Sequence, residues 1–545
     1  MTKPWFDQYD DWMPHEIDAD AYPNVVDMLL EAGETYRDKI AYSSFGATKT
    51  YGECLNLSRD FAAYLQNTVG IKKGDRVALM APNMMAFPIA MLGILRAGGV
   101  QVNVNPMYTA RELLHQLNDA DTDTIIIFSG STETLADVIN ETGIKNVIVA
   151  GLDDLIDIGL PSPPADLRLK DSILFKDAVA AGSETEFVKV ELCGDDLIYL
   201  QYTGGTTGVS KGAMLTHRNL VANVVQFESC VGEYIDHGND VVITAIPMYH
   251  IFALMVNTLA YFKFGGTNVL ITNPRDMPAF VAEWSKWKVN VFTGVNTLYN
   301  GLLHTSGFAD LDFSALRFSV GGGAAVQKAV SDRWKKATGK HIKEGYGLSE
   351  TSPILTLNPF GSEEFRGAIG IPAPSTDLSL RDDDGNVVAQ GERGELCAKG
   401  PQVMKGYWRR PDATAEAMTD DGYFCTGDIA VMDETGFFRI VDRKKDMIIV
   451  SGFNVFPNEI EAEVAAMDEV LECACIGVPN EKTGEAVKVF VVKKDDSLTE
   501  AAVKAHCKES LTGYKVPRQI VFIEELPKST VGKILRRELR DIQAG

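Results

Sequence analysis

The sequence lacks the cysteine pattern of a disulfide scaffold or a zinc site. Only eight cysteines occur among 545 residues, and no two of them form a Cys-x-x-Cys pair. Basic residues are also scarce, because 52 Lys and Arg stand against 75 Asp and Glu and leave a formal net charge of −23. Such a charge repels nucleic acids and anionic membrane surfaces. The composition therefore argues against both kinds of ligand and predicts reduced thiols in a cytosol.

The sequence also lacks a readable secretory signal, because no basic patch followed by an apolar core occurs at the N-terminus. One stretch, residues 241–262, is apolar and long enough to cross a bilayer. Pro247, His250 and Asn257 interrupt it, and the residue before a proline is disfavoured in a helix. We therefore expect a core strand over 241–246, a buried helix after Tyr249, and a cytoplasmic protein.

Strand-like and helix-like runs alternate through the first part of the chain. The strand-like runs cover residues 76–80, 100–104, 124–128, 289–293 and 316–320, and the helix-like runs cover 84–96 and 111–118. Alternation of this kind predicts an α/β fold with wound topology. In open α/β sheets, ligands bind at the carboxyl ends of the strands.

A chain of 545 residues is too long for one core. After about residue 441 the pattern changes to a short α+β module, preceded by the charged run Asp442–Asp446. We predict an N-terminal domain over residues 1–441, a linker over 442–447 and a C-terminal domain over 448–545. The plainer interpretation of the charged run is a solvated connector.

The segment Tyr202–Gly212 has the composition of a phosphate-binding loop. Glycines let backbone N–H groups face an anion, hydroxyls add donors, and one lysine adds a charge. The candidate ligands are Thr203, Gly204, Gly205, Thr206, Thr207, Gly208, Ser210 and Lys211. A P-loop NTPase is disfavoured, because Gly212 follows Lys211 where that loop needs Ser or Thr. The alternative is a flexible surface loop, although this one lies between an apolar strand and a helix start at Thr216.

Further motifs follow in order along the chain: Gly321–Ala325 with Glu344–Pro353, Tyr423–Asp428, Asp442–Met447 and Pro527–Lys533. With the phosphate loop, they resemble the motifs of the adenylate-forming family of acyl-CoA synthetases, firefly luciferase and peptide-synthetase adenylation domains. Pro247–Leu254, Ile271–Asp276 and Val450–Pro457 resemble bacterial long-chain fatty acid:CoA ligases most closely. The similarity runs nearly end to end.

The resemblance implies a fold and a reaction. The expected fold is a large N-terminal domain of wound α/β layers with a β-barrel-like part, followed by a small mobile α+β domain. ATP, CoA and Mg2+ would be used to turn a fatty acid into acyl-AMP and then into acyl-CoA. The alternatives are a medium-chain or aryl:CoA ligase, an enzyme that loads a carrier protein, and a catalytically silent binding protein. The family also allows a homodimer and transient contact with the inner membrane surface.

The resemblance implies nucleotide-binding roles, each with a plainer structural alternative. Glu350 would ligate Mg2+ rather than follow a helix cap. Tyr346 would stack on adenine rather than fill a core, and Asp428 would accept from the ribose hydroxyls rather than shape a turn. Thr351 would donate to the α-phosphate. The remaining candidates are Gly323, Ala324, Glu344, Gly345, Gly347, Ile440 and Arg443.

The other implied roles concern the acyl group and the movement of the C-terminal domain. Lys533 would bridge the carboxylate and the α-phosphate, Lys445 would be the pivot, and Gly452 would approach the pantetheine. His250 would lie beside the acyl site, although a lone histidine is more often a satisfied core residue. Some relatives have a tryptophan that gates an acyl tunnel where this chain has Leu254. The sequence therefore does not decide how such a tunnel would be gated here. Residues 247–254 contain no acid to pair a substrate ammonium, which disfavours amino acid activation.

Overall fold

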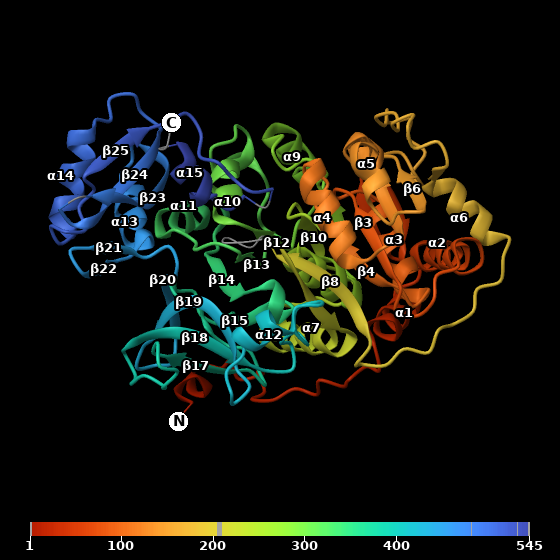
Figure 1. The fold of residues 1–545 in the computed structure, drawn as a ribbon, viewed down its shortest axis with the longest axis horizontal. Coiled ribbons are helices and arrows are strands. Elements are labelled where there is room, and N and C mark those ends of the chain that lie inside the picture. The colour runs from red at the N-terminus through yellow and green to blue at the C-terminus, as the bar shows by residue number, and fades with distance from the viewer. Residues whose placement is uncertain (1–2, 204–209, 481, 531, 543–545) are drawn as a thin grey trace.

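The computed structural model describes residues 3–203, 210–480, 482–530 and 532–542, and within them the strands form four sheets (Figure 1). The first sheet has the order β7-β6-β5-β3-β4-β8-β9 and is parallel except for the pair β8–β9. Its strands are β3 (Arg76–Met80), β4 (Val100–Asn103), β5 (Thr124–Phe128), β6 (Asn146–Ala150), β7 (Ile173–Leu174), β8 (Leu197–Thr203) and β9 (Lys211–Thr216). The three predicted strands between residues 76 and 128 are confirmed as β3, β4 and β5.

The second sheet has the order β16-β15-β14-β13-β12-β10-β11-β1-β2. Its strands are β1 (Ile40–Ser44), β2 (Ala47–Thr50), β10 (Val241–Thr244), β11 (Thr267–Leu270), β12 (Val291–Gly294), β13 (Phe318–Gly321), β14 (Ile342–Gly347), β15 (Ile354–Leu357) and β16 (Ile371–Pro372). The six central strands, β14, β13, β12, β10, β11 and β1, pair in parallel. The edge strands β2, β15 and β16 pair antiparallel. Together the two sheets confirm the predicted wound α/β fold.

Helices cover both faces of the first sheet, as alternation along β3 requires. Val77 and Leu79 share one apolar cluster with α2 and α3, and Ala78 and Met80 share another with α4 and α5, because successive strand side chains point to opposite faces. The α-helices are α1 (Val25–Thr35), α2 (Tyr51–Tyr64), α3 (Ala86–Arg96), α4 (Ala110–Ala120), α5 (Thr132–Val138), α6 (Phe175–Ser183), α7 (His217–Val231), α8 (Tyr261–Lys263), α9 (Met277–Trp284), α10 (Asn296–Leu303), α11 (Lys328–Thr338), α12 (Pro411–Glu416), α13 (Pro457–Ala465), α14 (Glu500–Ser510) and α15 (Arg536–Ile542).

The third sheet corrects the expectation of a barrel-like part. It consists of β17 (Asp377–Arg381), β18 (Arg393–Lys399), β19 (Phe424–Met432) and β20 (Phe438–Arg443). These strands pair antiparallel in sequence order, and among the described residues β20 does not pair back with β17. The sheet is therefore open. Trp5, Leu355 and Ile371 share one buried apolar cluster with residues of this sheet.

The fourth sheet belongs to the α+β module predicted at the C-terminus. Its order is β22-β21-β24-β23, with β25 paired in parallel to β24. The strands are β21 (Ile448–Val450), β22 (Phe453–Val455), β23 (Val470–Asn480), β24 (Gly484–Lys493) and β25 (Gln519–Phe522). Figure 1 shows this part, in blue, beside α10 and α11. The predicted linker, residues 442–447, begins inside β20 and continues as a turn.

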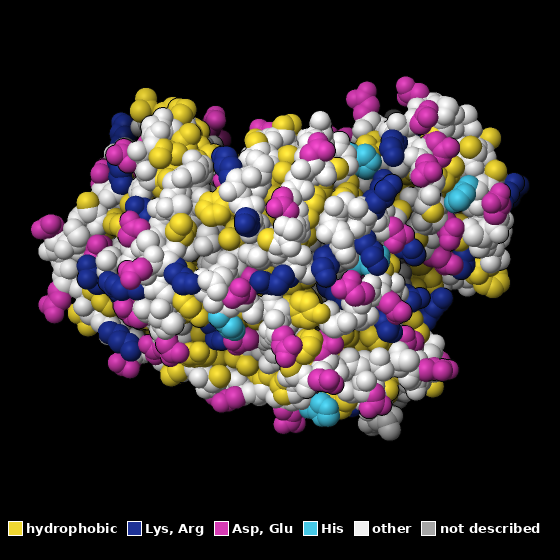
Figure 2. Space-filling view, turned by 180° about the vertical axis from the view of Figure 1, so that it is seen from behind, with side chains coloured by type: hydrophobic (Ala, Val, Ile, Leu, Met, Phe, Trp, Pro, Cys, Tyr) yellow, Lys and Arg dark blue, Asp and Glu magenta, His cyan; other side chains and the backbone are white. Residues whose placement is uncertain are grey.

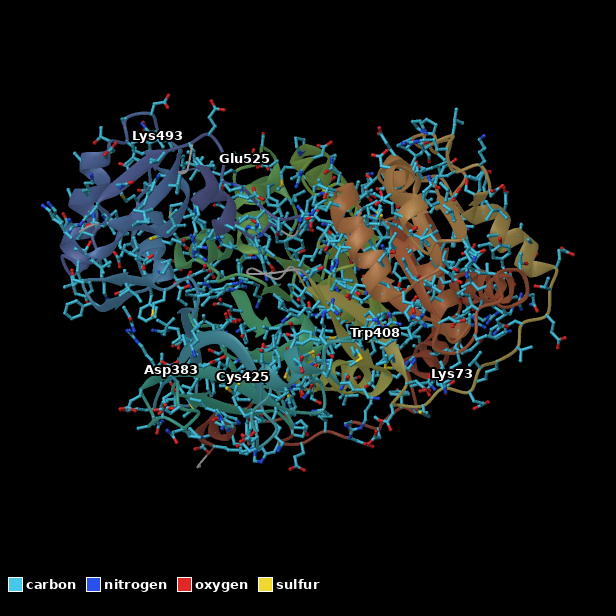
Figure 3. The ribbon with its side chains drawn as sticks, viewed as in Figure 1. Lys73, Asp383, Trp408, Cys425, Lys493 and Glu525 are labelled. Atoms are coloured by element: carbon cyan, nitrogen blue, oxygen red, sulfur yellow. The ribbon has the colours of Figure 1, made fainter. Side chains whose placement is uncertain are left out.

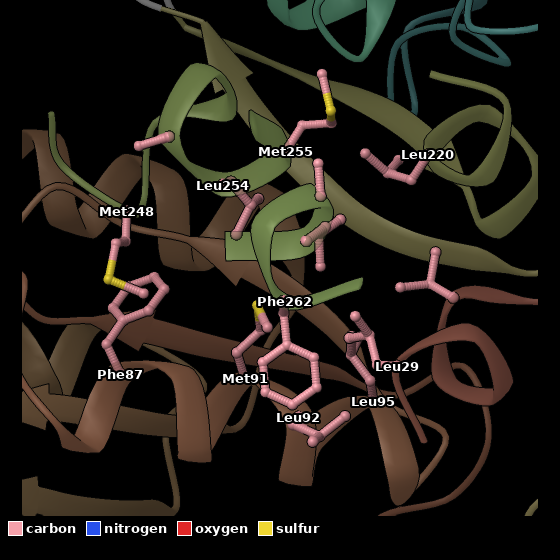
Figure 4. Close-up of a cluster of buried hydrophobic side chains, with 14 of the residues drawn as sticks. Leu29, Phe87, Met91, Leu92, Leu95, Leu220, Met248, Leu254, Met255 and Phe262 are labelled. Atoms are coloured by element: carbon pink, nitrogen blue, oxygen red, sulfur yellow. The ribbon is translucent and has the colours of Figure 1, made fainter. Parts of the chain in front are cut away.

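The apolar stretch 241–262 forms a strand and a buried helix, as predicted. β10 ends at Thr244, and a π-helical segment, η6 (Ala253–Ala260), leads into α8. Figure 4 shows Leu254 and Met255 of η6 among apolar side chains, with Met91 of α3 nearby. π-Helical turns are rare and occur frequently at functional sites. Among the described residues, no helix has the length and apolar character needed to span a bilayer.

The acidic excess is distributed over the surface. On the face seen in Figure 2, Asp and Glu side chains alternate with Lys and Arg over most of the molecule. An anionic ligand must therefore be met by charges gathered at one place. All eight cysteines are free thiols in the structure.

Candidate active site

The phosphate-loop candidate joins two antiparallel strands. β8 and β9 pair with Thr203 opposite Lys211, and residues 204–209 lie outside the described residues, with Gly204, Gly205, Thr206, Thr207 and Gly208 among them. The helix start predicted at Thr216 is confirmed, because the Thr216 hydroxyl accepts from Asn219 N at 3.2 Å and caps α7. An extra strand, β9, separates the loop from this helix. Thr203 and Lys211 are held by the register at the two ends of the loop.

Lys211 and Glu350 meet at Tyr407. The Lys211 ammonium lies 5.1 Å from the centre of the Tyr407 ring. The Tyr407 hydroxyl donates to Glu350 Oε1 at 2.8 Å. A cation and a carboxylate from segments far apart in sequence therefore share one aromatic side chain.

The environment of Glu350 fits a site for a hard cation. Its side chain lies in η8 (Ser349–Thr351) and is 7% exposed. Burial raises the pKa of its carboxyl, while the Tyr407 hydroxyl and the Lys533 charge oppose that rise. No group of three or more His, Cys, Asp or Glu in the part of the chain that the structure describes could hold a metal ion. A single carboxylate suits Mg2+ bound mainly through phosphate and water oxygens.

The end of β14 and the turn that follows it are tightly folded. A Cβ on Gly347 would overlap the carbonyl oxygen of Pro353, so only glycine fits there. A Cβ on Gly345 would lie 2.6 Å from Leu357 Cδ2. The fully buried Thr351 donates its hydroxyl to Pro353 O at 2.6 Å. Its predicted donation to the α-phosphate would require this bond to be exchanged.

Glu344 stands at the base of the same turn. It is buried, and its Oε1 accepts from Val326 N at 3.1 Å. Burial raises the pKa of this carboxyl to about 8, against the lowering effects of the Val326 N–H group and Arg439. Glu344 therefore links β14 to the segment that follows Gly321–Ala325.

Tyr346 of β14, in the second sheet, forms a second cluster with Asp428 and Arg443 of the third sheet. The Tyr346 hydroxyl donates to Asp428 Oδ2 at 2.5 Å, and Arg443 Nε lies 3.6 Å from Asp428 Oδ1. Asp428 and Arg443 are direct partners across β19 and β20. Ile440, three residues before Arg443 in β20, packs in the same apolar cluster as Tyr346.

Lys533 comes from the C-terminal part and reaches the wall formed by Gly323. A Cβ built on Gly323, whose φ is +78°, would lie 3.4 Å from Lys533 Cε. Gly323 and its neighbour Ala324 are exposed, so their backbone is open to a ligand. Burial and the nearby Arg443 lower the pKa of Lys533 to about 8, while Asp428 and Glu350 act in the opposite direction. Both acidic candidates are therefore near enough to act on the charge of Lys533.

Three hydrogen bonds hold the turn that carries Lys533. Tyr249 donates its hydroxyl to Thr530 Oγ1 at 2.7 Å, and Asn105 Nδ2 donates to the same oxygen at 3.4 Å. Thr297 donates to Gly532 O at 3.1 Å. The C-terminal part is therefore docked with Lys533 inside the site.

His250 lies at the edge of this group. Its Nδ1 accepts from Phe252 N at 3.3 Å, and the Phe252 ring comes within 3.2 Å of a Cβ built on Gly322. Burial and the Lys533 charge lower the pKa of the His250 imidazole to about 3, so it is neutral at pH 7. A neutral imidazole beside an apolar helix is compatible with either of its two predicted roles.

The remaining candidates lie in the C-terminal part and its connection. Burial, followed by the Arg443 charge, lowers the pKa of Lys445 to about 8, while Asp446 and Asp428 raise it. Lys445 therefore lies near the Asp428 cluster. Gly452 has a φ of +83° at the tip of the β21–β22 hairpin, and a Cβ there would meet no heavy atom within 4 Å. It faces open space and does not join the group around Lys533.

Sequence reasoning missed three residues that organise the site: Tyr407, Thr530 and Tyr249. Tyr407 lies in Lys405-Gly-Tyr-Trp-Arg-Arg410, where two aromatic residues stand between a glycine and two arginines. That unusual pair was a usable signal. Trp408, labelled in Figure 3, anchors the segment because its Nε1 donates to Asp119 O at 3.1 Å.

Comparison with known proteins identifies the family. Residues 29–408 match the AMP-binding enzymes, and residues 459–533 match the AMP-binding enzyme C-terminal domain. A long-chain-fatty-acid–CoA ligase of Salmonella typhimurium is 51% identical over 556 residues, which cover 100% of this chain and 99% of the relative.

Solved structures agree with this match. ATP-bound MatB from Rhodopseudomonas palustris has a TM-score of 0.82 at 31% identity, covering 95% of this chain and 99% of that one. Fatty acyl CoA synthetase of Mycobacterium tuberculosis has a TM-score of 0.71 at 29% identity, covering 95% and 98%. Motifs, fold and full-length similarity lead to one conclusion: this chain belongs to the family of AMP-binding enzymes.

Proposed function

We propose that this protein is a long-chain fatty acid:CoA ligase. It converts ATP, a fatty acid and CoA into acyl-CoA, AMP and diphosphate in two half-reactions. The observation that carries the proposal is the position of Lys533 against Gly323, with Asp428 and Glu350 acting on its charge. The 51% identity to a long-chain-fatty-acid–CoA ligase over the full chain supports the substrate class.

In the first half-reaction, a carboxylate oxygen of the fatty acid attacks the α-phosphorus of ATP. The new bond joins that oxygen to phosphorus, and the bond from phosphorus to the diphosphate oxygen breaks. Negative charge gathers on the α-phosphoryl oxygens and on the leaving group, so catalysis consists of placing cations there in advance. Lys533 is the cation for the carboxylate and α-phosphate, and Lys211 for the outer phosphates. No protein nucleophile is needed.

The nucleotide is held by the clusters that flank these lysines. Tyr346 stacks on the base, the exposed backbone of Gly323 and Ala324 lines it, and Asp428 with Arg443 faces the ribose. Mg2+ bound at Glu350 would neutralise phosphate charge and assist the departure of diphosphate.

In the second half-reaction, the CoA sulfur attacks the acyl carbon of acyl-AMP. The carbon–sulfur bond forms, the carbon–oxygen bond to AMP breaks, and the thiol proton passes to solvent. Lys533 and its turn occupy the site in the structure, so we propose that the C-terminal part turns about Lys445 and brings Gly452 toward the pantetheine. The exposed Gly452 hairpin is available for such a contact.

The acyl chain would lie beside His250 and the η6 segment. Leu254, Met255 and Val256 of this segment are fully buried and share an apolar cluster with Met91 and Phe262 (Figure 4). An alkyl chain gains about 0.8 kcal/mol per buried CH2, or about fourfold in affinity. A long apolar substrate therefore draws most of its binding from such a surface.

The test measures AMP release and acyl-CoA formation with ATP, Mg2+ and CoA across acetate, octanoate, palmitate, oleate and benzoate. We expect the highest kcat/KM with palmitate and oleate. Preference for benzoate or acetate would overturn the substrate class. Absence of AMP with every acid would overturn the ligase assignment and favour a binding protein.

A further inference from the structure

We infer that Tyr407 is a positioning residue that holds Glu350 and Lys211 apart, so that each charge faces the nucleotide instead of the other. The inference rests on the proposed function and adds to it a residue outside the family motifs identified in the sequence. It concerns one side chain with two contacts, one through its hydroxyl and one through its ring.

The two contacts differ in kind. The hydroxyl donates to Glu350 Oε1 at 2.8 Å, and the other carboxylate oxygen, Oε2, is not bound by this hydroxyl. The ring face receives the Lys211 ammonium at 5.1 Å from its centre. A π-face attracts a cation without neutralising its charge. Lys211 therefore keeps its full charge for a phosphate.

Tyr407 is fixed to the strand that carries Lys211. Its backbone pairs with Ala213 of β9, the strand that begins at Lys211. The next residue along the chain extends this connection, because Trp408 N donates to Gly212 O at 2.8 Å. The ring therefore keeps its place beside the first residues of β9.

The same segment is also fixed to Glu350. Met404 N donates to Glu350 O at 2.7 Å. Tyr407 N donates to Thr414 Oγ1 at 2.9 Å and fixes the backbone between the connection to Glu350 and the connection to β9. The ring is therefore built into the framework that sets the spacing of the two charges.

The charges would otherwise attract each other. Among the described residues, Lys211 and Glu350 form no ion pair within 4.0 Å, although both contact the same ring. An ion pair between them would remove one charge from the phosphates and one from the metal ion. By binding one oxygen of the carboxylate, the Tyr407 hydroxyl prevents Glu350 from turning toward Lys211.

The test is the affinity for ATP in EDTA, measured by titration calorimetry, so that the readout is independent of metal and of turnover. Removal of the hydroxyl in Tyr407→Phe frees Glu350 to pair with Lys211, and we expect the Kd for metal-free ATP to rise about fivefold. Addition of Glu350→Gln removes the competing carboxylate. The double variant should then bind metal-free ATP as tightly as Glu350→Gln alone.

Tyr423→Phe is a matched control, because Tyr423 begins the motif Tyr423–Asp428 but its side chain contacts Asp377 and Arg381, which have no proposed role in the site. The Tyr423 hydroxyl donates to Asp377 Oδ2 at 2.8 Å, and Arg381 lies over its ring at 4.8 Å. The control repeats the same set of interactions and should leave the affinity for ATP unchanged. Thermal unfolding of every variant checks that it is folded. Tyr407→His, which keeps a planar ring with a donor, should recover part of the affinity.

Two results would overturn the inference: wild-type affinity for metal-free ATP in Tyr407→Phe, or a loss that Glu350→Gln does not restore. The second result would mean that Tyr407 only supports the fold. Failure of the wild-type protein to bind ATP would instead overturn the proposed function, and the inference with it.

Discussion

Tyr346 donates its hydroxyl to Asp428 at 2.5 Å and thereby joins strand β14 to strand β19. This bond fixes the position of the ring. In the proposed function the ring face and the hydroxyl have separate tasks, because the face would stack on the base while the hydroxyl holds the carboxylate proposed to bind the ribose.

Substitution of Tyr346 separates these tasks. Tyr346→Leu removes the ring face, and loss of base stacking costs about 1–3 kcal/mol, so we expect the Kd for ATP to rise on the order of tenfold to a hundredfold. Tyr346→Phe keeps the ring and should weaken ATP binding by only a few-fold. Calorimetric titration with ATP compares the two variants. Equal losses would assign the effect to the hydroxyl and reject stacking.

Lys533→Ala should separate the two half-reactions. Removal of a preorganised cation from developing charge costs about 3–4 kcal/mol, which is a hundredfold to a thousandfold in rate. We expect that loss in palmitoyl-AMP formation, measured by rapid quench. The same variant supplied with synthetic palmitoyl-AMP and CoA should form palmitoyl-CoA near the wild-type rate. Equal losses in both steps would sink the alternating arrangement.

The first half-reaction should also depend on pH through Lys533. Its pKa is lowered to about 8 by burial, so the ammonium form dominates at pH 7 and is lost as the pH rises through 8. We expect kcat/KM for ATP in acyl-AMP formation to fall above about pH 8. Lys533→Arg, with a pKa above about 12, should show no such decline up to about pH 9.5. A decline at the same pH in both proteins would assign it to another group.

Lys445→Pro should impair the step that Lys533→Ala spares. Lys445 lies in the turn after β20, and proline fixes its φ. We expect palmitoyl-AMP to form at close to the wild-type rate and its conversion to palmitoyl-CoA to slow at least about tenfold. Both steps are followed by rapid quench. Lys444→Pro would not be a clean control for this variant. Proline has no N–H, so it would also remove the hydrogen bond that Lys444 N donates to Gly427 O at 3.0 Å. Normal thioester formation would remove Lys445 from the pivot.

His217 predicts how stability changes with pH. It is 1% exposed at the start of α7, and its Nδ1 accepts from Val25 N at 3.2 Å. Burial lowers its pKa to about 4, and Lys73 adds to this effect while Asp196 and Asp27 oppose it. In the unfolded chain the His217 imidazole takes up a proton near pH 6.5, whereas in the folded chain it stays neutral until about pH 4. Stability is therefore fully present above about pH 6.5 and falls by up to about 3 kcal/mol on going to about pH 4.

The measurement is the thermal unfolding midpoint at pH 7 and pH 5. His217→Gln keeps an acceptor without a titrating ring, so its midpoint should fall less between the two pH values than that of the wild type. The comparison of each protein with itself removes any loss that the substitution causes at pH 7. An identical fall in both proteins would exclude His217 as the source.

The strands that a sequence pattern could predict are those with continuous apolar runs. β3, β4 and β5 begin within the predicted ranges because each is buried on both faces and needs apolar residues throughout. β9 escaped prediction, since Lys-Gly-Ala-Met-Leu-Thr has little strand propensity and is stabilised by pairing with β8 and with Tyr407. The π-helical form of η6 was also missed, because its apolar residues surround the helix and leave no period to read.

The residues of the candidate site were predictable where they lie in one short sequence motif. Glu350, Asp428 and Lys533 were chosen on this basis. In the structure, Glu350 and Asp428 both act on the charge of Lys533 and oppose the lowering of its pKa by burial. Tyr407 contacts Glu350 across 57 residues of sequence, and Tyr249 contacts Thr530 across 281. No local pattern records a contact between such distant segments, so these partners required the folded chain.

The turn with Thr530 and Lys533 links closure to charge. Thr530 accepts two of the three hydrogen bonds that dock the turn, and Lys533, three residues later, brings the ammonium to the site. The two events therefore occur together. In the movement that we propose, ATP that binds while this part is turned away would lack the ammonium, and its α-phosphorus would be less reactive toward water. The protein would then avoid wasteful hydrolysis without a separate lid, because the group proposed to activate the nucleotide would arrive only when the enclosure is complete.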